Sequence, residues 1–164
     1  MTRVLVISDS HGARDSLRWV LTHEQADALI YLGDGLADLD VVAEVKPKGF
    51  FVYRVRGNCD FAFSAEPVVG LAGFGGVLIF YTHGHMYGVK SGLYQLAEVA
   101  DERMADIALY GHTHRQQVDF EELEGKPTLF NPGSLGFGGQ YGVLECEEGE
   151  YRILECRVPA AERG

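Results

Sequence analysis

The sequence predicts an α/β fold in which two β-sheets pack against each other and helices cover their outer faces. Two observations predict this architecture. Residues 2–55 alternate short apolar runs with amphipathic segments, which is the pattern of a parallel sheet with helical crossovers. Residues 117–158 instead contain apolar runs separated by Gly-rich or acidic turns, which is typical of antiparallel hairpins.

The first part of the chain has the pattern β-α-β-α-β. Consecutive apolar residues favour a strand over 2–8 that is buried on both faces. A helix is predicted over 14–23, because Leu17, Val20 and Leu21 would share one face. The pattern then predicts a strand over 28–32, a helix over 37–45 that ends near Pro47, and a strand over 50–55.

The rest of the chain is predicted from the same signals. Strands are expected over 77–81 and 106–110, with a helix over 93–100 between them. Four more strands are expected over 117–123, 127–131, 141–146 and 151–158. In the last hairpin, a turn centred on Glu148-Gly149 pairs Cys146 with Tyr151 and Cys156 with Tyr141, so these cysteines do not face each other.

Size and composition indicate one domain. The chain has 164 residues, of which 46% are hydrophobic, so we expect a single domain over 1–158 and a frayed tail over 159–164. Its three cysteines, an odd number, argue against a disulfide framework. No apolar run reaches the roughly 18 residues that span a bilayer, so we expect a cytoplasmic protein without membrane contact. A formal charge of -10 predicts no stable binding to nucleic acid and leaves homo-oligomerisation open.

Polar clusters follow five of the apolar runs. The carboxyl ends of parallel strands form the ligand crevice of such sheets, so these clusters should converge. Five of the six histidines lie in them, and only His23 lies elsewhere, on a predicted helix. Burying so many polar groups without a partner or a metal would cost several kcal/mol each. The clusters are Asp9-Ser10-His11, Gly33-Asp34, Gly57-Asn58, His83-Gly84-His85 and His112-Thr113-His114.

The spacing inside two clusters suits metal binding. Asp9 and His11, one residue apart, would point to the same side of an extended segment, about 6–7 Å apart at the backbone. His112 and His114 have the same spacing. Each pair is therefore able to converge on one ion, and the paired histidines look like two metal ligands.

In chain order, these motifs closely resemble the signature of the calcineurin-like metallophosphoesterases, and the short chain is similar to their small bacterial and archaeal phosphodiesterase branch. The resemblance covers residues 4 to about 146. It implies a four-layer α-β-β-α sandwich, with two mixed sheets flanked by helices and a dimetal site at the carboxyl ends of strands. The motifs are D-x-H (9–11), G-D (33–34), R-G-N-C-D (56–60), T-H-G-H (82–85), G-H-T-H (111–114) and N-P-G-S (131–134).

The resemblance also implies a ligand set. By motif match, the first ion would be held by Asp9, His11, Asp34 and His114, and the second by Asp34, Asn58, His83 and His112, with Asp34 bridging. Two cations about 3.5–4 Å apart can acidify a bridging water and clamp the attacking and leaving oxygens at phosphorus. Nitrogen and oxygen donors fit several transition metals, and we expect Mn, with Ni, Zn, Fe or Co as alternatives. The implied catalytic residues are Asp34, Asn58 and His85.

One position departs from the family pattern. Many members carry histidine directly after G-N, where it is thought to assist the leaving group, whereas this chain has Cys59. A thiol is a poor general acid at neutral pH. The substitution favours substrates with a good leaving group, or it passes the proton to His85 or a metal-bound water. His85 could instead hydrogen-bond the phosphate or support the ligand residues.

The sequence thus predicts a metal-dependent phosphoesterase that acts on a small phosphorylated substrate, a phosphodiester or nucleotide. Diesters are favoured over monoesters because only Arg56, Lys90 and Arg115 lie near the motifs. The alternative is a noncatalytic scaffold like the retromer subunit that resembles this branch, although all seven ligand positions here carry competent side chains.

Neighbouring residues have two interpretations each. Phe61, Phe63 and Tyr87 could stack on a base or aryl group, or could be ordinary packing. Asp60 could orient a ligand histidine or form a turn.

Overall fold

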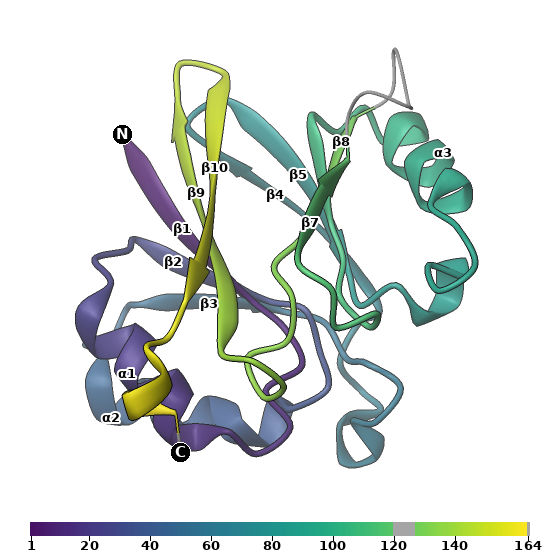
Figure 1. Ribbon diagram of the computed structural model, residues 1–164. Coiled ribbons are helices and arrows are strands. Elements are labelled where there is room, and N and C mark those ends of the chain that lie inside the picture. The colour runs from purple at the N-terminus through teal and green to yellow at the C-terminus, as the bar shows by residue number, and fades with distance from the viewer. Residues whose placement is uncertain (120–126, 164) are drawn as a thin grey trace.

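The computed structural model describes residues 1–119 and 127–163, and its layers are visible in Figure 1. Two five-stranded sheets pack against each other. Helices α1 (Arg14–His23) and α2 (Asp40–Val45) cover the outer side of one sheet, and α3 (Tyr94–Glu102) covers the outer side of the other. The expected four-layer α-β-β-α sandwich is therefore confirmed.

The first sheet contains the predicted parallel strands. Its order is β10-β9-β1-β2-β3. Strands β1, β2 and β3 run parallel, and β9 pairs antiparallel with both β1 and β10. The sheet is mixed, as expected. The bounds are β1 Thr2–Ile7, β2 Ala28–Tyr31, β3 Phe51–Arg54, β9 Gln140–Glu147 and β10 Glu150–Arg157.

The second sheet has the order β4-β5-β6-β8-β7. Strands β5, β6 and β8 are parallel, and the outer strands β4 and β7 are antiparallel to their neighbours. Each sheet thus contains three adjacent parallel strands, β1-β2-β3 on one side of the first sheet and β5-β6-β8 in the middle of the second, so that strand ends from both can face one crevice. The bounds are β4 Val69–Phe74, β5 Val77–Thr82, β6 Ile107–Leu109, β7 Gln117–Asp119 and β8 Thr128–Asn131.

The sequence analysis did not predict one strand, and one predicted helix differs in length and type from the structure. Strand β4 was not predicted, because its glycines at 70 and 73 weaken the strand pattern; pairing with β5 supplies its hydrogen bonds. The predicted helix over 37–45 is a 3-10 turn, η1 (Leu36–Leu39), followed by the short α2. Of the strand expected over 117–123, residues 117–119 form β7, and the remainder lies outside the described residues.

Three apolar layers stabilise the sandwich. Leu5 and Ile7 of β1 pack with α1 and α2, whereas Val4 and Val6 pack between the two sheets. Successive side chains of a strand point to opposite faces, so a strand covered on both sides needs an unbroken apolar run. A third cluster lies between α3 and the second sheet.

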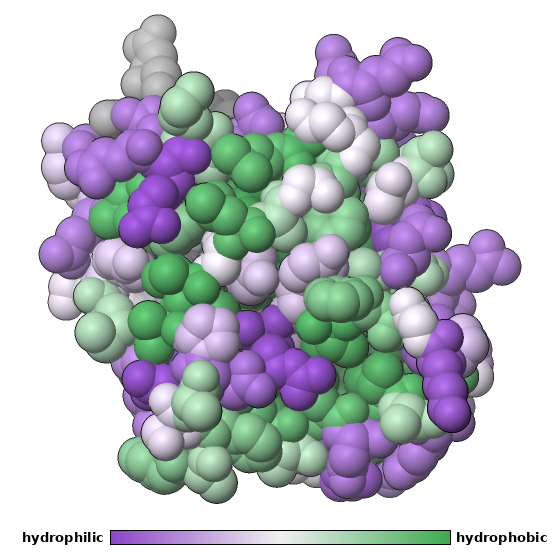
Figure 2. All heavy atoms as spheres, turned by 180° about the vertical axis from the view of Figure 1, so that it is seen from behind, coloured by the Kyte–Doolittle hydropathy of each residue, from purple (hydrophilic) through white to green (hydrophobic). Residues whose placement is uncertain are grey.

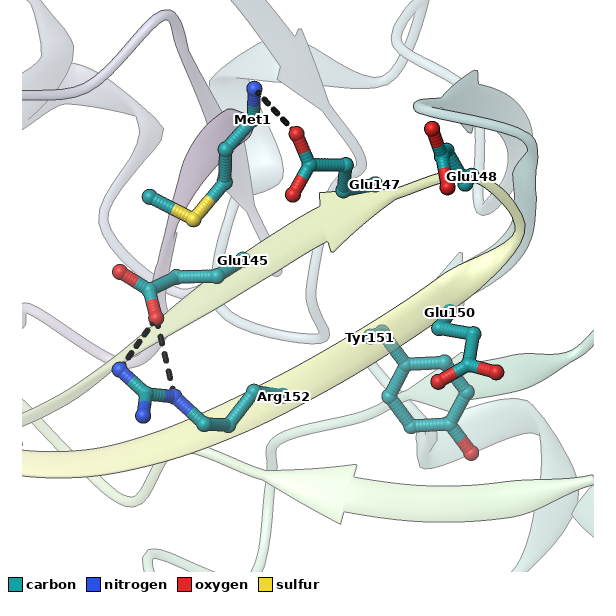
Figure 3. Close-up of a pocket in the computed structure, with 7 residues that line it drawn as sticks. All are labelled: Met1, Glu145, Glu147, Glu148, Glu150, Tyr151 and Arg152. Carbon is teal, nitrogen blue, oxygen red and sulfur yellow. Dashed lines mark hydrogen bonds and ion pairs between the residues drawn. The ribbon is translucent and has the colours of Figure 1, made fainter.

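The C-terminal hairpin has the predicted register. Cys146 pairs with Tyr151 and Cys156 with Tyr141, and all three cysteines are free. Figure 3 shows the tip of this hairpin, where the Met1 amino group pairs with Glu147 over 3.3 Å. The tail expected to fray contains a 3-10 turn, η4 (Ala160–Glu162), near α1; fraying and the single-domain boundary stay predictions.

On the face seen in Figure 2, hydrophobic residues gather across the middle and hydrophilic residues lie mostly at the upper corners and in a patch below the centre. Large exposed hydrophobic side chains include Phe51 of β3 and Leu71 of β4, which are edge strands of the two sheets. Among the described residues, no helix is both long and apolar enough to cross a membrane.

The layer between the sheets should dominate stability. Ile79 on β5 is 0% exposed there, so Ile79→Ala should lower the free energy of unfolding by about 2–5 kcal/mol. Leu71→Ala, on neighbouring β4 at 44% exposure, is the matched control and should cost less than about 1 kcal/mol. Urea denaturation measures both. Equal losses in the two variants would contradict this packing.

Glu145 on β9 should make stability depend on pH. Hydrogen bonds from Arg152, visible in Figure 3, and from Arg3 outweigh partial burial and lower the pKa of Glu145. A lowered pKa in the folded state stabilises the protein at pH values above the unfolded-state pKa of about 4.3. This stabilisation is lost as the pH falls through the folded-state pKa. The unfolding free-energy difference between wild type and Glu145→Gln should therefore shrink from pH 7 to pH 3.

Glu150→Gln, at an exposed carboxylate of the same hairpin, is the control for this comparison. A difference for Glu145→Gln that stays constant with pH, or that matches the control at every pH, would contradict the assignment.

Candidate metal centre

The loops after four strands meet at one end of the sandwich and are bonded to one another. These loops follow β1, β2, β5 and β6. Within the first sheet, the Asp9 N–H donates to the Gly33 carbonyl over 2.9 Å. Between the sheets, His83 Nδ1 lies 2.7 Å from the Leu32 carbonyl oxygen. The carboxyl ends of both sheets therefore form one crevice.

Six of the seven predicted ligand residues fall into two groups of three. In each group, one possible ligand atom from every residue lies within 4.8 Å of the others. His112 and His114 belong to different groups, as in the ligand set that the resemblance implies, and do not meet at one site as their spacing alone would allow. The first group is Asp9, His11 and His114, and the second is Asp34, His83 and His112.

The backbone explains this division. Seven non-glycine residues of the described chain have positive φ, and five of them are members of these groups. His112 has φ 71° and His114 has φ 62°, so their segment is not extended and their rings diverge. Left-handed backbone is uncommon for residues with a Cβ and costs free energy, which the surrounding contacts must offset. The members are Asp9, His11, Asp34, His112 and His114.

Asp9 is the buried carboxylate of the first group, at 0% exposure. Its Oδ2 accepts hydrogen bonds from the Ser8 hydroxyl and from the His112 N–H, the latter over 3.1 Å. Its Oδ1 lies 3.1 Å from His114 Nε2 and 3.5 Å from His11 Nε2. One oxygen is thus fixed by protein donors while the other faces two imidazoles.

Asp34 has the same division of roles in the second group. Its Oδ1 accepts the Cys59 N–H over 2.8 Å. Its Oδ2 lies 3.2 Å from His83 Nε2 and 3.9 Å from His11 Nε2 of the first group. This oxygen therefore reaches imidazoles of both groups. Asp9 Oδ1 does the same, because it also lies 3.9 Å from His83 Nε2, so the distances allow either carboxylate to bridge.

The surroundings of His83 fit a cation. Nδ1 lies against the Leu32 carbonyl and so carries the proton, which leaves the Nε2 lone pair facing Asp34 Oδ2. Although these atoms are 3.2 Å apart, Nε2 is buried and has no partner in hydrogen-bonding geometry. Two acceptors facing each other in a buried site repel unless a positive charge lies between them. A proton or a divalent metal ion satisfies this requirement, and metal-bound histidines often donate their second N–H to a backbone carbonyl.

The pKa shifts of the protein without metal follow from the same contacts. Burial opposes the charge of Asp34, but His83 and the Cys59 N–H outweigh it and hold the pKa of Asp34 well below its usual range. Burial likewise opposes protonation of His83, but Asp34 and Asp9 raise its pKa. Burial, His83 and Lys90 lower the pKa of His112 to about 4, which keeps this imidazole neutral and able to coordinate.

His85 lies outside both groups, and Asn58, as an amide, is not among the histidines and carboxylates that make up the groups. Asn58 is exposed, and its amide nitrogen lies 3.5 Å from Cys59 Sγ. The His85 ring centroid is 5.4 Å from that of His83 and 6.3 Å from that of His112. His85 Nδ1 is buried without a hydrogen-bond partner, so this ring lies beside the candidate centre with one polar atom unsatisfied.

Asp60 joins two of the ligand loops, a role that the sequence reading did not assign. Its carboxylate accepts the Asp34 N–H over 2.7 Å and the Gly57 N–H over 2.7 Å, and also the N–H groups of Gly35 and Leu36. Asp60 neither touches a ligand histidine nor forms only a turn. The sequence signal was weak, because the four donors come from two segments, residues 34–36 and residue 57, that are 21–23 residues apart.

The segment after β8 supports Asp9 from the other side. The Asn131 side chain donates to the Gly111 carbonyl over 3.2 Å and to Thr113 Oγ1 over 3.0 Å. The Ser134 hydroxyl donates to the Asp9 carbonyl over 2.8 Å. The N-P-G-S motif is therefore a turn that also fixes two ligand loops.

One of the larger surface hollows of the described residues lies elsewhere. It has a volume of 560 Å³ and is lined by the hairpin tip of Figure 3, where four glutamates gather around Tyr151 and Arg152. It contains no histidine and is far from the strand ends that carry the two groups. Size alone therefore does not locate the chemistry.

Comparison with known proteins agrees with this geometry. A family model described as a calcineurin-like phosphoesterase superfamily domain matches residues 2–149. A Bacillus subtilis protein named "Probable metallophosphoesterase YsnB" is 36% identical over 135 residues, which cover 80% of this chain and 74% of that protein.

Two solved structures have the same fold. A predicted phosphoesterase from Streptococcus pneumoniae is 26% identical with a TM-score of 0.75, covering 97% of this chain and 94% of that one. Vps29 from Entamoeba histolytica complexed with Zn is 20% identical with a TM-score of 0.80, covering 97% of this chain and 94% of that one. At this identity, the second comparison shows the fold alone.

Asp60 should control how well the ligand loops are held. In Asp60→Asn, the amide NH2 cannot accept, and each backbone N–H left unpaired costs about 1–3 kcal/mol. We expect a lower free energy of unfolding and Mn(II) affinity reduced by about 10–100-fold, as for other residues that orient ligands. Urea denaturation and calorimetric Mn(II) titration measure the two effects.

Asp15→Asn removes an equally charged but exposed carboxylate from α1 and serves as the control. If Asp60→Asn bound Mn(II) as tightly as this control, the positioning role of Asp60 would be wrong.

Proposed function

The chain belongs to the calcineurin-like phosphoesterase superfamily, and from this premise we propose that it is a metal-dependent phosphodiesterase. One observation carries the proposal. The buried carboxylates of Asp9 and Asp34 face imidazole nitrogens at 3.1–3.9 Å, and the Nε2 lone pair of His83 faces Asp34 Oδ2, an arrangement that a cation between these groups would stabilise. The donors lie in a crevice that is open to a small substrate.

We assign the two ions to the two groups of side chains. Asp9, His11 and His114 would hold one ion, and His83 and His112 the other, with Asp34 shared between them. The support for sharing is that Asp34 Oδ2 approaches both His11 and His83. Asn58 would complete the second site through its amide oxygen, because it follows β3 beside Cys59 and Asp34.

The bound ions would polarise phosphoryl oxygens and lower the pKa of a water molecule. Nitrogen and oxygen donors without thiolate suit Mn, Fe, Co, Ni or Zn, and Mn(II) is our choice for assays. The free thiols of Cys59, Cys146 and Cys156 support the expected cytoplasmic location.

The residues of the chain would bind and orient the substrate. Asp9 and Asp34 are held by backbone and side-chain donors, which fixes the site before substrate arrives. We assign His85 the role of a hydrogen-bonding partner of the phosphate, because its Nδ1 is buried without a partner next to the centre. Burial and His83 lower the pKa of His85, so that its ring is neutral near pH 7.

The surroundings favour diesters with a good leaving group. In the described chain, no Lys or Arg lies within ion-pair distance of Asp9 or Asp34, and Lys90 and Arg56 act on the site only through space, at His112 and His85. We therefore favour a phosphate with one charge over a monoester with two. Burial and the charge of Asp34 raise the pKa of the Cys59 thiol, which makes it a still weaker acid for an expelled alkoxide.

A noncatalytic scaffold is the second candidate, favoured by the likeness to Vps29. The two candidates differ in a simple measurement. A protein that binds two equivalents of Mn(II) and hydrolyses an activated diester is an enzyme, whereas one that remains inert after metal loading is a scaffold.

Asp34→Asn should remove activity while keeping the fold. The substitution preserves shape but removes the shared negative charge, so hydrolysis of bis(p-nitrophenyl) phosphate with Mn(II) should fall by at least about 100-fold. Circular dichroism should show unchanged secondary structure. Asp40→Asn, at an exposed carboxylate six residues away, is the charge-matched control and should retain wild-type turnover. Wild-type activity in Asp34→Asn would overturn the proposed site.

A further inference from the structure

A second feature adjoins the candidate metal centre. A cavity of 290 Å³ lies between the loops after β1, β2 and β3, and two candidate ligands, His11 and Asp34, form part of its wall. Its volume is at the lower end of the range of about 300–1,000 Å³ for ligand pockets, so it has room for one substituent and not for a large molecule. A phosphate at the centre would direct one of its ester groups into this cavity.

The opposite wall of the cavity is apolar. It is formed by η2 (Phe61–Phe63) and by Ala37 of η1. Phe63 is half-buried and packs on the core under α1 and α2, which fixes its position. Phe61 is 86% exposed, and no aromatic ring of the described residues stacks on it. A single exposed aromatic side chain needs no ligand to explain it, but the place of Phe61 on the wall of a cavity beside the candidate centre leaves its ring available to a substrate.

The charges of the wall select against anions. Asp34, Asp38 and Asp60 line the cavity, and no Lys or Arg is found among its described lining residues. Asp38 accepts from the Ser10 hydroxyl over 2.6 Å and from the Gly12 N–H over 2.9 Å. Asp60 is likewise occupied by backbone N–H groups, so neither carboxylate is free to bind a ligand donor. An uncharged flat group meets apolar surface without such a conflict.

We propose that this cavity binds an uncharged aromatic ester group of the phosphodiester substrate, with Phe61 stacking on it as a specificity-determining residue. The inference rests on the proposed function, because the metal centre must hold the phosphate. It names the substrate class of that site as aryl or nucleobase-bearing diesters.

The test uses nonhydrolysable monoanions, so that binding is measured without turnover. Methyl(phenyl)phosphinate and dimethylphosphinate both present one charge to the metals, and only the first carries an aromatic ring. With the Mn(II)-loaded protein, calorimetric titration or competition should show about tenfold tighter binding of the phenyl compound, equivalent to about 1.4 kcal/mol. In Phe61→Ala this ratio should fall to within about threefold, while the affinity for dimethylphosphinate stays unchanged.

Phe51→Ala removes an aromatic side chain of comparable exposure that does not line this cavity, and it should keep the wild-type ratio. A wild-type ratio near one, or equal ratios in Phe61→Ala and Phe51→Ala, would overturn the proposal.

A second pair of variants tests the charge selection. Methyl(4-carboxyphenyl)phosphinate should bind at least tenfold more weakly than the phenyl compound. Ala62→Lys, at an exposed position of the cavity wall, should restore its binding, whereas Ala65→Lys, exposed on the same loop outside the cavity, should not. Restoration by both lysines would show a general field effect and contradict a local pocket. Tighter binding of the 4-trimethylammoniophenyl analogue than of the phenyl compound would overturn the assignment of an uncharged group.

The measurements distinguish failure of the proposed enzymatic function from failure of the cavity assignment. Selective phosphinate binding without hydrolysis of any diester would remove the enzyme assignment and leave the cavity assignment standing. Diester hydrolysis with no aromatic selectivity would leave the enzyme assignment standing and overturn the cavity assignment.

Discussion

The structure depends on the burial of two carboxylates against imidazole nitrogens. Asp9 and Asp34 are almost fully buried, and their second oxygens face His11, His83 and His114 at hydrogen-bond or slightly longer distances. His114 Nε2 can donate to Asp9, but His83 donates from Nδ1, so its Nε2 lone pair faces Asp34 Oδ2, and this contact is favourable only with a proton or a metal ion between the two atoms. The family membership is consistent with divalent cations in this place. The remaining architecture serves to hold these groups still until the cations bind.

The scaffold does this through contacts between loops. Asp60 collects four backbone N–H groups, and Ser134 and Asn131 tie the β8 end to the Asp9 and Gly111 loops. These bonds offset the cost of left-handed backbone at the ligand residues. At Gly33, an added Cβ would lie 2.6 Å from the Gly57 nitrogen, so only glycine allows two of the loops to approach this closely.

The crevice has two unlike sides. Next to His11, the wall is apolar and acidic, with Phe61 exposed. On the other side, Lys90 lowers the pKa of His112, so its positive charge reaches the second group. A substrate whose phosphate lies on the metals therefore meets different surroundings on each side. This asymmetry is a physical basis for preferring one ester substituent over another, whereas the metal ligands recognise only the phosphate.

The sequence by itself determined where most of the strands and the polar clusters lie along the chain, because strand and turn signals are local. It gave the register of the Cys146–Tyr151 pair for the same reason. It missed β4, whose glycines give no local signal, and it treated the His112 segment as extended. Only the tertiary structure showed the left-handed backbone that directs His112 and His114 to different groups, and only it gave Asp60 its four donors. These features depend on left-handed dihedrals and on contacts between distant segments, and neither is encoded by the spacing of neighbouring residues.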